Sequence, residues 1–134
     1  MKILALDLGD KWVGSAISDA LGITCRPYQT IEIKQLIPFL EKTISEENIE
    51  KIIVGYPKTI SGTESLQTQK TVKVKEELEK KFPGIKWILW DERLSSKRAE
   101  EIMRRSKKEK LNEHSIAAAF ILQSYLDSIA LHQN

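Results

Sequence analysis

The chain has 134 residues, 41% of them hydrophobic and 30% charged, which predicts one domain over residues 1–134. The formal net charge of +2 gives by itself no argument for a nucleic-acid partner. Cys25 is the sole cysteine, which excludes an internal disulfide and suits a reducing compartment. No stretch reaches the roughly 18–20 apolar residues that span a bilayer, so the sequence predicts a cytoplasmic protein without a membrane partner.

The first third of the sequence predicts an antiparallel meander. The apolar runs Lys2–Asp7 and Lys11–Ser18 are joined by too few residues for a crossover, so we expect them to pair as a hairpin. The segment Ile23–Ile33 is rich in β-branched residues and predicts a third antiparallel strand. Because Pro27 has no backbone N–H, it indicates an edge position or a bulge.

Helices then alternate with two further strands. Apolar residues at helical spacing predict a helix over Lys34–Glu47, and Lys51–Gly55 reads as a strand buried on both faces. The sequence Ser61-Gly62-Thr63-Glu64 fits a capping box that opens a long polar helix to about Lys81. The apolar run Ile85–Trp90 predicts another strand buried on both faces.

The last part of the chain predicts two helices on either side of a basic segment. Ser95 or Ser96 can cap a short helix. The run Arg104–Lys110 has five basic residues in seven positions, and we expect it to be a solvated loop that is mobile without ligand. A strongly apolar helix is expected over Ile116–Leu131.

These elements predict an α/β fold with a mixed five-stranded sheet and helices on its faces. The first three strands form the meander, and the last two, each preceded by a helix, run parallel to the first strand. Ligands usually bind at the carboxyl ends of the parallel strands of such sheets. Asp7, Gly55–Lys58 and Asp91–Arg93 occupy those ends here, so acidic residues from two strands meet one edge of the sheet.

Four motifs occur in order along nearly the whole chain. They are Asp7-Leu8-Gly9-Asp10-Lys11 with Gly14, Val54-Gly55-Tyr56-Pro57 with Gly62-Thr63, Asp91-Glu92-Arg93-Leu94-Ser95, and Ala117-Ala118-Ala119-Phe120-Ile121-Leu122-Gln123. Together they resemble the motifs of the pre-16S rRNA nuclease family, the YqgF-type, RuvC-like homologues of Holliday junction resolvases. This resemblance implies a ribonuclease H-like fold and nuclease chemistry on nucleic acid.

One position departs from the family pattern. Where the family usually has an Asp at the start of the last helix, this chain has His114, preceded by Glu113. Glu113 is displaced by one residue, about 100° around a helix. His114 could bind a metal ion or orient water as a neutral imidazole, so either residue could replace the third acid. The alternative is a solvated histidine in the first turn.

Two cations about 3.5–4 Å apart can activate water and stabilise the leaving oxygen in phosphodiester hydrolysis, and hard oxygen ligands suit Mg²⁺ or Mn²⁺. Asp7 is the expected bridging ligand, because the central strand fixes it most rigidly. Asp91 is the expected second ligand and Glu92 the reserve. If the last strand lies two places from the first, about 9–10 Å separates their backbones. The catalytic residues are predicted to be Asp7, Asp91 and His114.

Basic side chains near this edge are expected to contact substrate phosphates. They are Lys11, Lys58, Arg93, Lys107, Lys108 and Lys110. Lys58 and Arg93 could instead form ion pairs with Asp91 or Glu92, and the lysines of the basic run could simply be solvated.

The resemblance favours a metal-dependent nuclease that acts on a structured rRNA precursor, at the 5′ end of pre-16S rRNA, in ribosome biogenesis. A Holliday junction resolvase and a non-catalytic RNA-binding assembly factor are the alternatives. A monomer or a weak homodimer is expected. An ATPase of the actin-like or sugar-kinase type shares this sheet topology, but it needs two such domains around the nucleotide.

Overall fold

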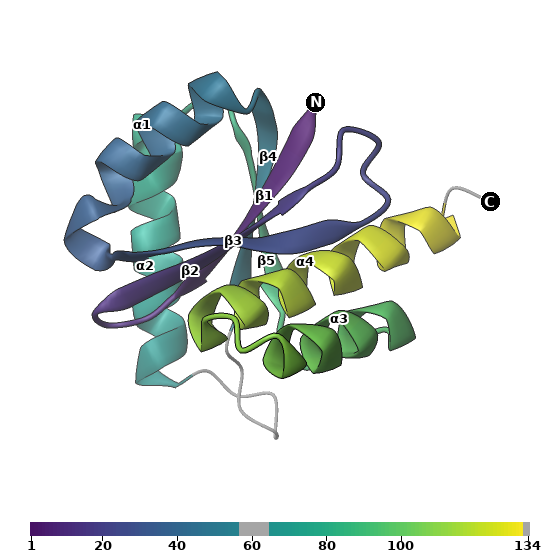
Figure 1. Ribbon diagram of the computed structural model, residues 1–134. Coiled ribbons are helices and arrows are strands. Elements are labelled where there is room, and N and C mark those ends of the chain that lie inside the picture. Colours follow the sequence, from purple (N-terminus) through teal and green to yellow (C-terminus); the bar gives the residue numbers. More distant parts are fainter. Residues whose placement is uncertain (57–64, 133–134) are drawn as a thin grey trace.

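A five-stranded sheet flanked by helices makes up the part of the chain that the computed structural model describes, residues 1–56 and 65–132 (Figure 1). The elements in chain order are β1 (Lys2–Leu8), β2 (Trp12–Ser18), β3 (Cys25–Glu32), the 3₁₀ turn η1 (Ile33–Gln35), α1 (Leu36–Glu46), β4 (Ile49–Tyr56), α2 (Leu66–Lys81), β5 (Lys86–Asp91), α3 (Lys97–Lys108) and α4 (Glu113–His132).

The sheet is mixed, with strand order β3-β2-β1-β4-β5. β2 pairs antiparallel with both β1 and β3, whereas β4 runs parallel to both β1 and β5. The predicted meander followed by two parallel strands is therefore confirmed. β4 lies between β1 and β5, so the two strands expected to supply acids are not neighbours.

Alternation of side chains along the strands divides the core into two layers. Leu4 and Leu6 of β1 face α1 and α2, whereas Ile3 and Ala5 face α3 and α4. Each fully buried leucine or isoleucine stabilises the fold by roughly 1.5–3 kcal/mol. The same alternation places Asp7 on the α3/α4 side of the sheet.

The two edge strands bear on two of the sequence predictions. Pro27 lies in the edge strand β3, beside an irregularity in its pairing with β2, as expected. The prediction that the fifth strand is buried on both faces is wrong. Among the described residues, β5 is an edge strand that pairs with β4 alone, and this edge position leaves most of its side chains half-buried.

The helix boundaries differ from the prediction at two places. Ser65 is the N-cap of α2 and accepts a hydrogen bond from the Thr68 N–H, while the capping box expected at 61–64 lies outside the described residues. The predicted loop over 104–110 is wrong for residues 104–108, which are helical. Ile102 and Ser106 are buried on one face of α3. Burial of this face stabilises the helix through its basic end.

α4 crosses the face of the sheet formed by β1, β2 and β3, and α3 packs beside it (Figure 1). Ala118 and Ala119 are fully buried there, and their small side chains let the helix approach the sheet closely. Among the described residues, no helix is both long and apolar enough to cross a membrane.

Candidate functional site

Asp7 lies near the carboxyl end of the central strand β1, where it is paired with Gly14 of β2. Its half-buried carboxylate accepts a hydrogen bond from the side chain of Glu92. Burial raises the pKa of Asp7, against the lowering effects of the Glu92 hydrogen bond and of the nearby His114. Two acids from distant parts of the chain therefore form one pair.

Glu92 is the hydrogen-bond donor of this pair. Burial raises the pKa of Glu92 to about 7, and the negative charge of Asp7, the hydrogen bond to Asp7 and the charge of Asp91 add to the rise. The protonated carboxyl of Glu92 donates to Asp7, because the negative charge of Asp7 makes ionisation of Glu92 costly. Below about pH 7 the pair holds a proton that a bound cation could displace.

Gly55 explains how Glu92 reaches Asp7 although β4 lies between their strands. A Cβ atom at Gly55 would stand 2.6 Å from Glu92 Oε1 and 2.5 Å from Ile121 Cδ1. The backbone N–H of Glu92 donates to the carbonyl of Tyr56, the next residue of β4, at 3.3 Å. The missing side chain thus gives Glu92 room to pass over the intervening strand. The sequence shows this glycine in the Val54–Pro57 motif but not its purpose.

The structure does not bring the Asp91 carboxylate to Asp7. Asp91 is the last residue of β5 and pairs with Tyr56, so strand alternation puts its side chain with Leu89 on the α1/α2 side. Its carboxylate accepts from Nη2 of Arg93 at 2.7 Å and from the Arg93 N–H at 2.9 Å. Of the predicted roles for Arg93, the structure shows the ion pair with Asp91.

The first turn of α4 lies beside Asp7. The His114 carbonyl occupies the space that a Cβ at Gly14 would need, and Gly14 is the residue paired with Asp7. Asn112 Oδ1 accepts a hydrogen bond from the His114 N–H at 2.9 Å, which fixes the start of the helix. The His114 side chain is 34% exposed, and that of Glu113 is 89% exposed. The geometry thus brings His114, and not Glu113, to the acid pair.

The predicted phosphate contacts are scattered around this end of the molecule. Lys11 lies in the β1–β2 turn, with its ammonium 5.6 Å from the centre of the Trp12 ring. Lys107 and Lys108 end α3, and Lys110 follows with a left-handed φ of 59°. All four lysines are exposed. Lys58 lies outside the described residues.

The acid pair fits a divalent cation. Asp7 and Glu92 offer hard oxygen ligands, and a cation between them would offset the cost of burying their negative charges, which raises the pKa of both. Among residues 1–56 and 65–132, no three His, Cys, Asp or Glu side chains are grouped closely enough to hold a metal ion. Among the described residues, Asp7 and Glu92 would thus be two ligands of a cation, and no complete site for one ion or for the two expected ions is formed.

Comparisons with known proteins agree with this architecture. A sequence model described as "RuvX: Holliday junction resolvase" matches residues 1–128. The chain belongs to this family. A relative in Syntrophus aciditrophicus, described as "Putative pre-16S rRNA nuclease", is 39% identical over 137 residues, which cover 97% of this chain and 91% of the relative. A relative with the same description in Aster yellows witches'-broom phytoplasma is 42% identical over 140 residues, covering 98% and 92%.

Solved structures of Holliday junction resolvases share the fold. Thermus thermophilus RuvC in complex with a Holliday junction superposes with a TM-score of 0.64 at 12% identity, covering 97% of this chain and 96% of RuvC. The fowlpox virus resolvase gives a TM-score of 0.58 at 18% identity, with coverage of 96% and 99%. The predicted RuvC-like, ribonuclease H-like fold of the family is thereby confirmed.

Proposed function

We propose that the protein is a nuclease that hydrolyses phosphodiester bonds with a divalent cation, Mg²⁺ or Mn²⁺, and that it processes the 5′ end of pre-16S rRNA in the cytoplasm. The observation that carries this proposal is the hydrogen-bonded pair of Asp7 and Glu92 at the carboxyl edge of the sheet. The description of the relatives supports the rRNA precursor as substrate. Two of the proposed metal ligands thus come from β1 and from the residue after β5.

A bound divalent cation would stabilise negative charge on the phosphate and favour ionisation of a water molecule. Asp7 and Glu92 would hold it, and both must ionise to do so, which makes binding release their shared proton. His114, beside Asp7, would be a third ligand of this cation. Asp91 would act indirectly, because its pair with Arg93 fixes the backbone just before and after Glu92.

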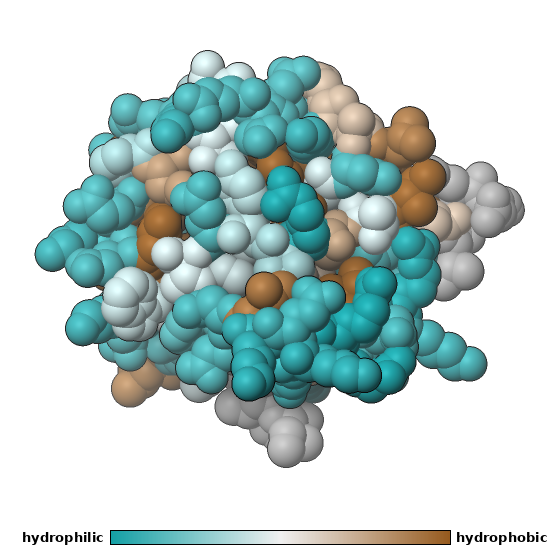
Figure 2. Space-filling view, in the orientation of Figure 1, coloured by the Kyte–Doolittle hydropathy of each residue, from teal (hydrophilic) through white to brown (hydrophobic). Residues whose placement is uncertain are grey.

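The basic end of α3 would bind the nucleic-acid backbone. The exposed lysines are Lys107 and Lys108, in the last turn of α3, and Lys110, which follows that helix. α4, with His114 in its first turn, begins shortly after them in the chain. The surface over α3, at the bottom of Figure 2, is largely hydrophilic. Side chains of this kind contact phosphates without reading bases. We therefore expect binding that depends strongly on salt and little on sequence.

The decisive experiment incubates the protein with end-labelled precursor rRNA, duplex DNA and four-way junctions, with Mn²⁺ or with EDTA. Asp7→Asn should abolish cleavage and leave folding and nucleic-acid binding intact, because the amide keeps the volume and loses the charge. Asp10→Asn is the matched control, since the side chain of Asp10 is 76% exposed and forms an ion pair with Lys70 at 3.8 Å. Cleavage by the Asp7 variant at the wild-type rate would refute a metal-dependent nuclease.

Two variants test the start of α4. His114→Ala should lower cleavage strongly, and His114→Asp should restore it with Mg²⁺, because a carboxylate is the harder ligand. Glu113→Gln should have the smaller effect, because its side chain is 89% exposed and its Oε1 lies 3.9 Å from His114 Nε2 rather than at the acid pair. A His114→Ala variant with unchanged rate and metal preference would exclude His114 from the reaction.

The family description and the RuvC-like fold favour a second candidate, cleavage of Holliday junctions. Selective cleavage of the four-way junction, with the precursor rRNA left intact, would decide for this candidate. Binding of the rRNA without cleavage in any divalent cation would instead identify a non-catalytic assembly factor.

A further inference from the structure

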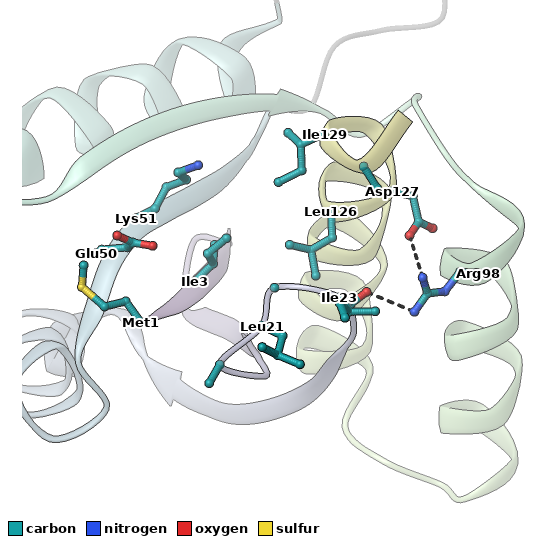
Figure 3. A pocket seen from close by; sticks show the side chains of 13 residues that line it. Met1, Ile3, Leu21, Ile23, Glu50, Lys51, Arg98, Leu126, Asp127 and Ile129 are labelled. Atoms are coloured by element: carbon teal, nitrogen blue, oxygen red, sulfur yellow. Dashed lines mark hydrogen bonds and ion pairs between the residues drawn. The ribbon is translucent and has the colours of Figure 1, made fainter. Parts of the chain in front are cut away.

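Exposed apolar side chains lie beyond one end of strand β2 and at the other. At the end far from Asp7, Leu21 and Ile23 lie in the hairpin that leads to β3 and line a hollow of about 360 Å³ (Figure 3). An ion pair within the chain, from Arg98 to Asp127 at 3.4 Å, forms part of the rim of this hollow. Leu21, which is 80% exposed there, provides a control position away from the candidate nuclease site.

Trp12 is the exposed apolar residue at the other end of β2. It begins the strand and is 37% exposed, whereas the rest of the strand is buried. The Gly9 N–H donates a hydrogen bond to the Trp12 carbonyl at 2.9 Å, so backbone atoms close the β1–β2 turn and the turn does not require an indole. Leaving part of a large aromatic ring in water forgoes some of the stabilisation that full burial would give.

Trp12 lies on the face of the sheet that carries the acid pair. Val13 packs in the core layer under α1 and α2, so strand alternation turns Trp12 and Gly14 to the opposite face. Gly14 is paired with Asp7 and lies against the His114 carbonyl. The spacing of residues along and between strands puts the Cα atoms of Trp12 and Asp7 about 8–9 Å apart. One nucleotide can therefore reach both the indole and the proposed metal ligands.

The start of α4 leaves the Trp12 ring partly open. Thr30 Oγ1 donates a hydrogen bond to Asn112 Oδ1 at 2.9 Å, which ties the residue before this helix to β3. Thr30 is paired with Gly14, whereas Trp12 is paired with Glu32, two residues further along β3. Trp12 thus lies beyond the point where the helix begins, at the edge of the candidate site.

Lysines lie around the exposed ring. The ammonium of Lys11 is 5.6 Å from the centre of the Trp12 ring, in a cation–π contact. Two acids of the adjoining turns are each paired with a lysine, Glu32 with Lys34 at 3.2 Å and Asp10 with Lys70 at 3.8 Å. A phosphate beside the ring would therefore meet the charge of Lys11, and the paired lysines would offset repulsion from these two acids.

We infer that Trp12 is a stacking platform for an unpaired base of the substrate, beside the phosphodiester bond that is held at the acid pair. The inference rests on the proposed nuclease function and narrows its substrate to a strand that is unpaired next to the cleaved bond. The base lies flat on the indole, and Lys11 contacts the adjoining phosphate. Stacking uses the π-face that every base has, so it discriminates single strands from duplexes and not one sequence from another.

An unpaired base suits this position better than a protein partner. The centre of a protein interface is depleted of charged residues. Charged residues lie next to Trp12, with Lys11 before it in the chain and Glu32 opposite it in β3. An aromatic ring beside basic side chains is the combination that binds single-stranded nucleic acid.

Binding of labelled oligonucleotides in EDTA, followed by fluorescence anisotropy, tests the inference without any cleavage. Trp12→Ala should bind single-stranded RNA and DNA at least fivefold more weakly than the wild type, and Trp12→Phe should keep most of the affinity, because both rings stack on bases. All three proteins should bind a blunt RNA duplex equally, since its bases are already stacked on each other. Leu21→Ala is the control and should bind every probe like the wild type.

The salt dependence separates stacking from charge. In a plot of log binding constant against log salt concentration, Trp12→Ala should lie below the wild type with the same slope, because the ring neutralises no phosphate. Circular dichroism checks the folding of each variant. Wild-type affinity of Trp12→Ala for single strands, or an equal loss of affinity for the duplex, would overturn the inference.

An abasic nucleotide locates the stacked base. One abasic nucleotide in the cleaved strand should slow cleavage of the bond beside it at least fivefold in the wild type, and Trp12→Ala should show no such difference. Equal slowing in both proteins would show that the base beside the cleaved bond does not lie on Trp12. If the protein cleaves no probe, the proposed function fails, whereas the binding measurements in EDTA still decide whether Trp12 stacks on bases.

Discussion

Replacing Glu92 by Gln should stabilise the metal-free protein at high pH. The folded state holds the proton of Glu92 up to a pKa of about 7, compared with 4.5 for an ordinary glutamate. The stabilisation from the neutral carboxyl is therefore fully present below about pH 4.5 and is lost as the pH rises through 7. A shift of this size corresponds to at most about 3 kcal/mol. Because Glu92 is only half-buried, solvent screening reduces the expected effect to about 1–2 kcal/mol.

Urea denaturation in EDTA at pH 5 and pH 8 measures this effect. Between these pH values the free energy of unfolding of the wild type should fall by about 1–2 kcal/mol more than that of Glu92→Gln. Glu113→Gln is the control and should follow the wild type, since its side chain is 89% exposed. Millimolar Mn²⁺ at pH 8 should stabilise the wild type and not Glu92→Gln, because only the pair of carboxylates binds the cation. Parallel pH profiles for wild type and Glu92→Gln would refute the shared proton.

Three further predictions follow from the backbone and the basic end of α3. Gly55→Ala should cost about 1–3 kcal/mol of stability and abolish cleavage, because the added Cβ displaces Glu92. Gly84→Ala is the control and should be harmless, because its Cβ would meet no atom within 4 Å. Urea denaturation and the cleavage assay check both variants. Lys110→Gly should raise the free energy of unfolding by about 0.5–1 kcal/mol, since glycine adopts its left-handed φ without strain; an unchanged urea midpoint would count against this. When Lys107, Lys108 and Lys110 are changed together to Ala, the plot of log binding constant for RNA against log salt concentration should become less steep. The slope should change by up to about 0.7–0.9 for each phosphate that is no longer neutralised. A slope equal to that of the wild type would show that these lysines are merely solvated.

Local patterns in the sequence identified most of the fold. Runs of apolar residues, a short hairpin turn and helical spacing predicted the order of strands and helices, because these signals depend on neighbours in the chain. The basic run was predicted to be a loop, and the structure shows helix through Lys108. The signal for that helix was the burial of Ser106 against the rest of the molecule, which a polar residue does not reveal in advance.

The sequence also predicted which edge of the sheet holds the candidate site, but it did not predict which acids form that site. Asp7 ends an apolar run and begins a turn, so its place at the end of a central strand followed from the sequence. Whether Asp91 or Glu92 meets it depends on the exact end of β5, because a shift by one residue moves a side chain to the opposite face of the sheet. Both residues are acids, so composition could not choose between them.

The sequence by itself determined that an acid lies at the carboxyl end of the first strand. It also determined that a helix with His114 in its first turn follows the basic run. Only the tertiary structure decided that Glu92 passes over Gly55 to share a proton with Asp7. It also decided that Leu21, in the β2–β3 hairpin, lines a hollow together with residues from the start of β1 and the second half of α4. Both results depend on distances between segments that are remote in the chain, and such distances are fixed by strand order and packing rather than by local residue preferences.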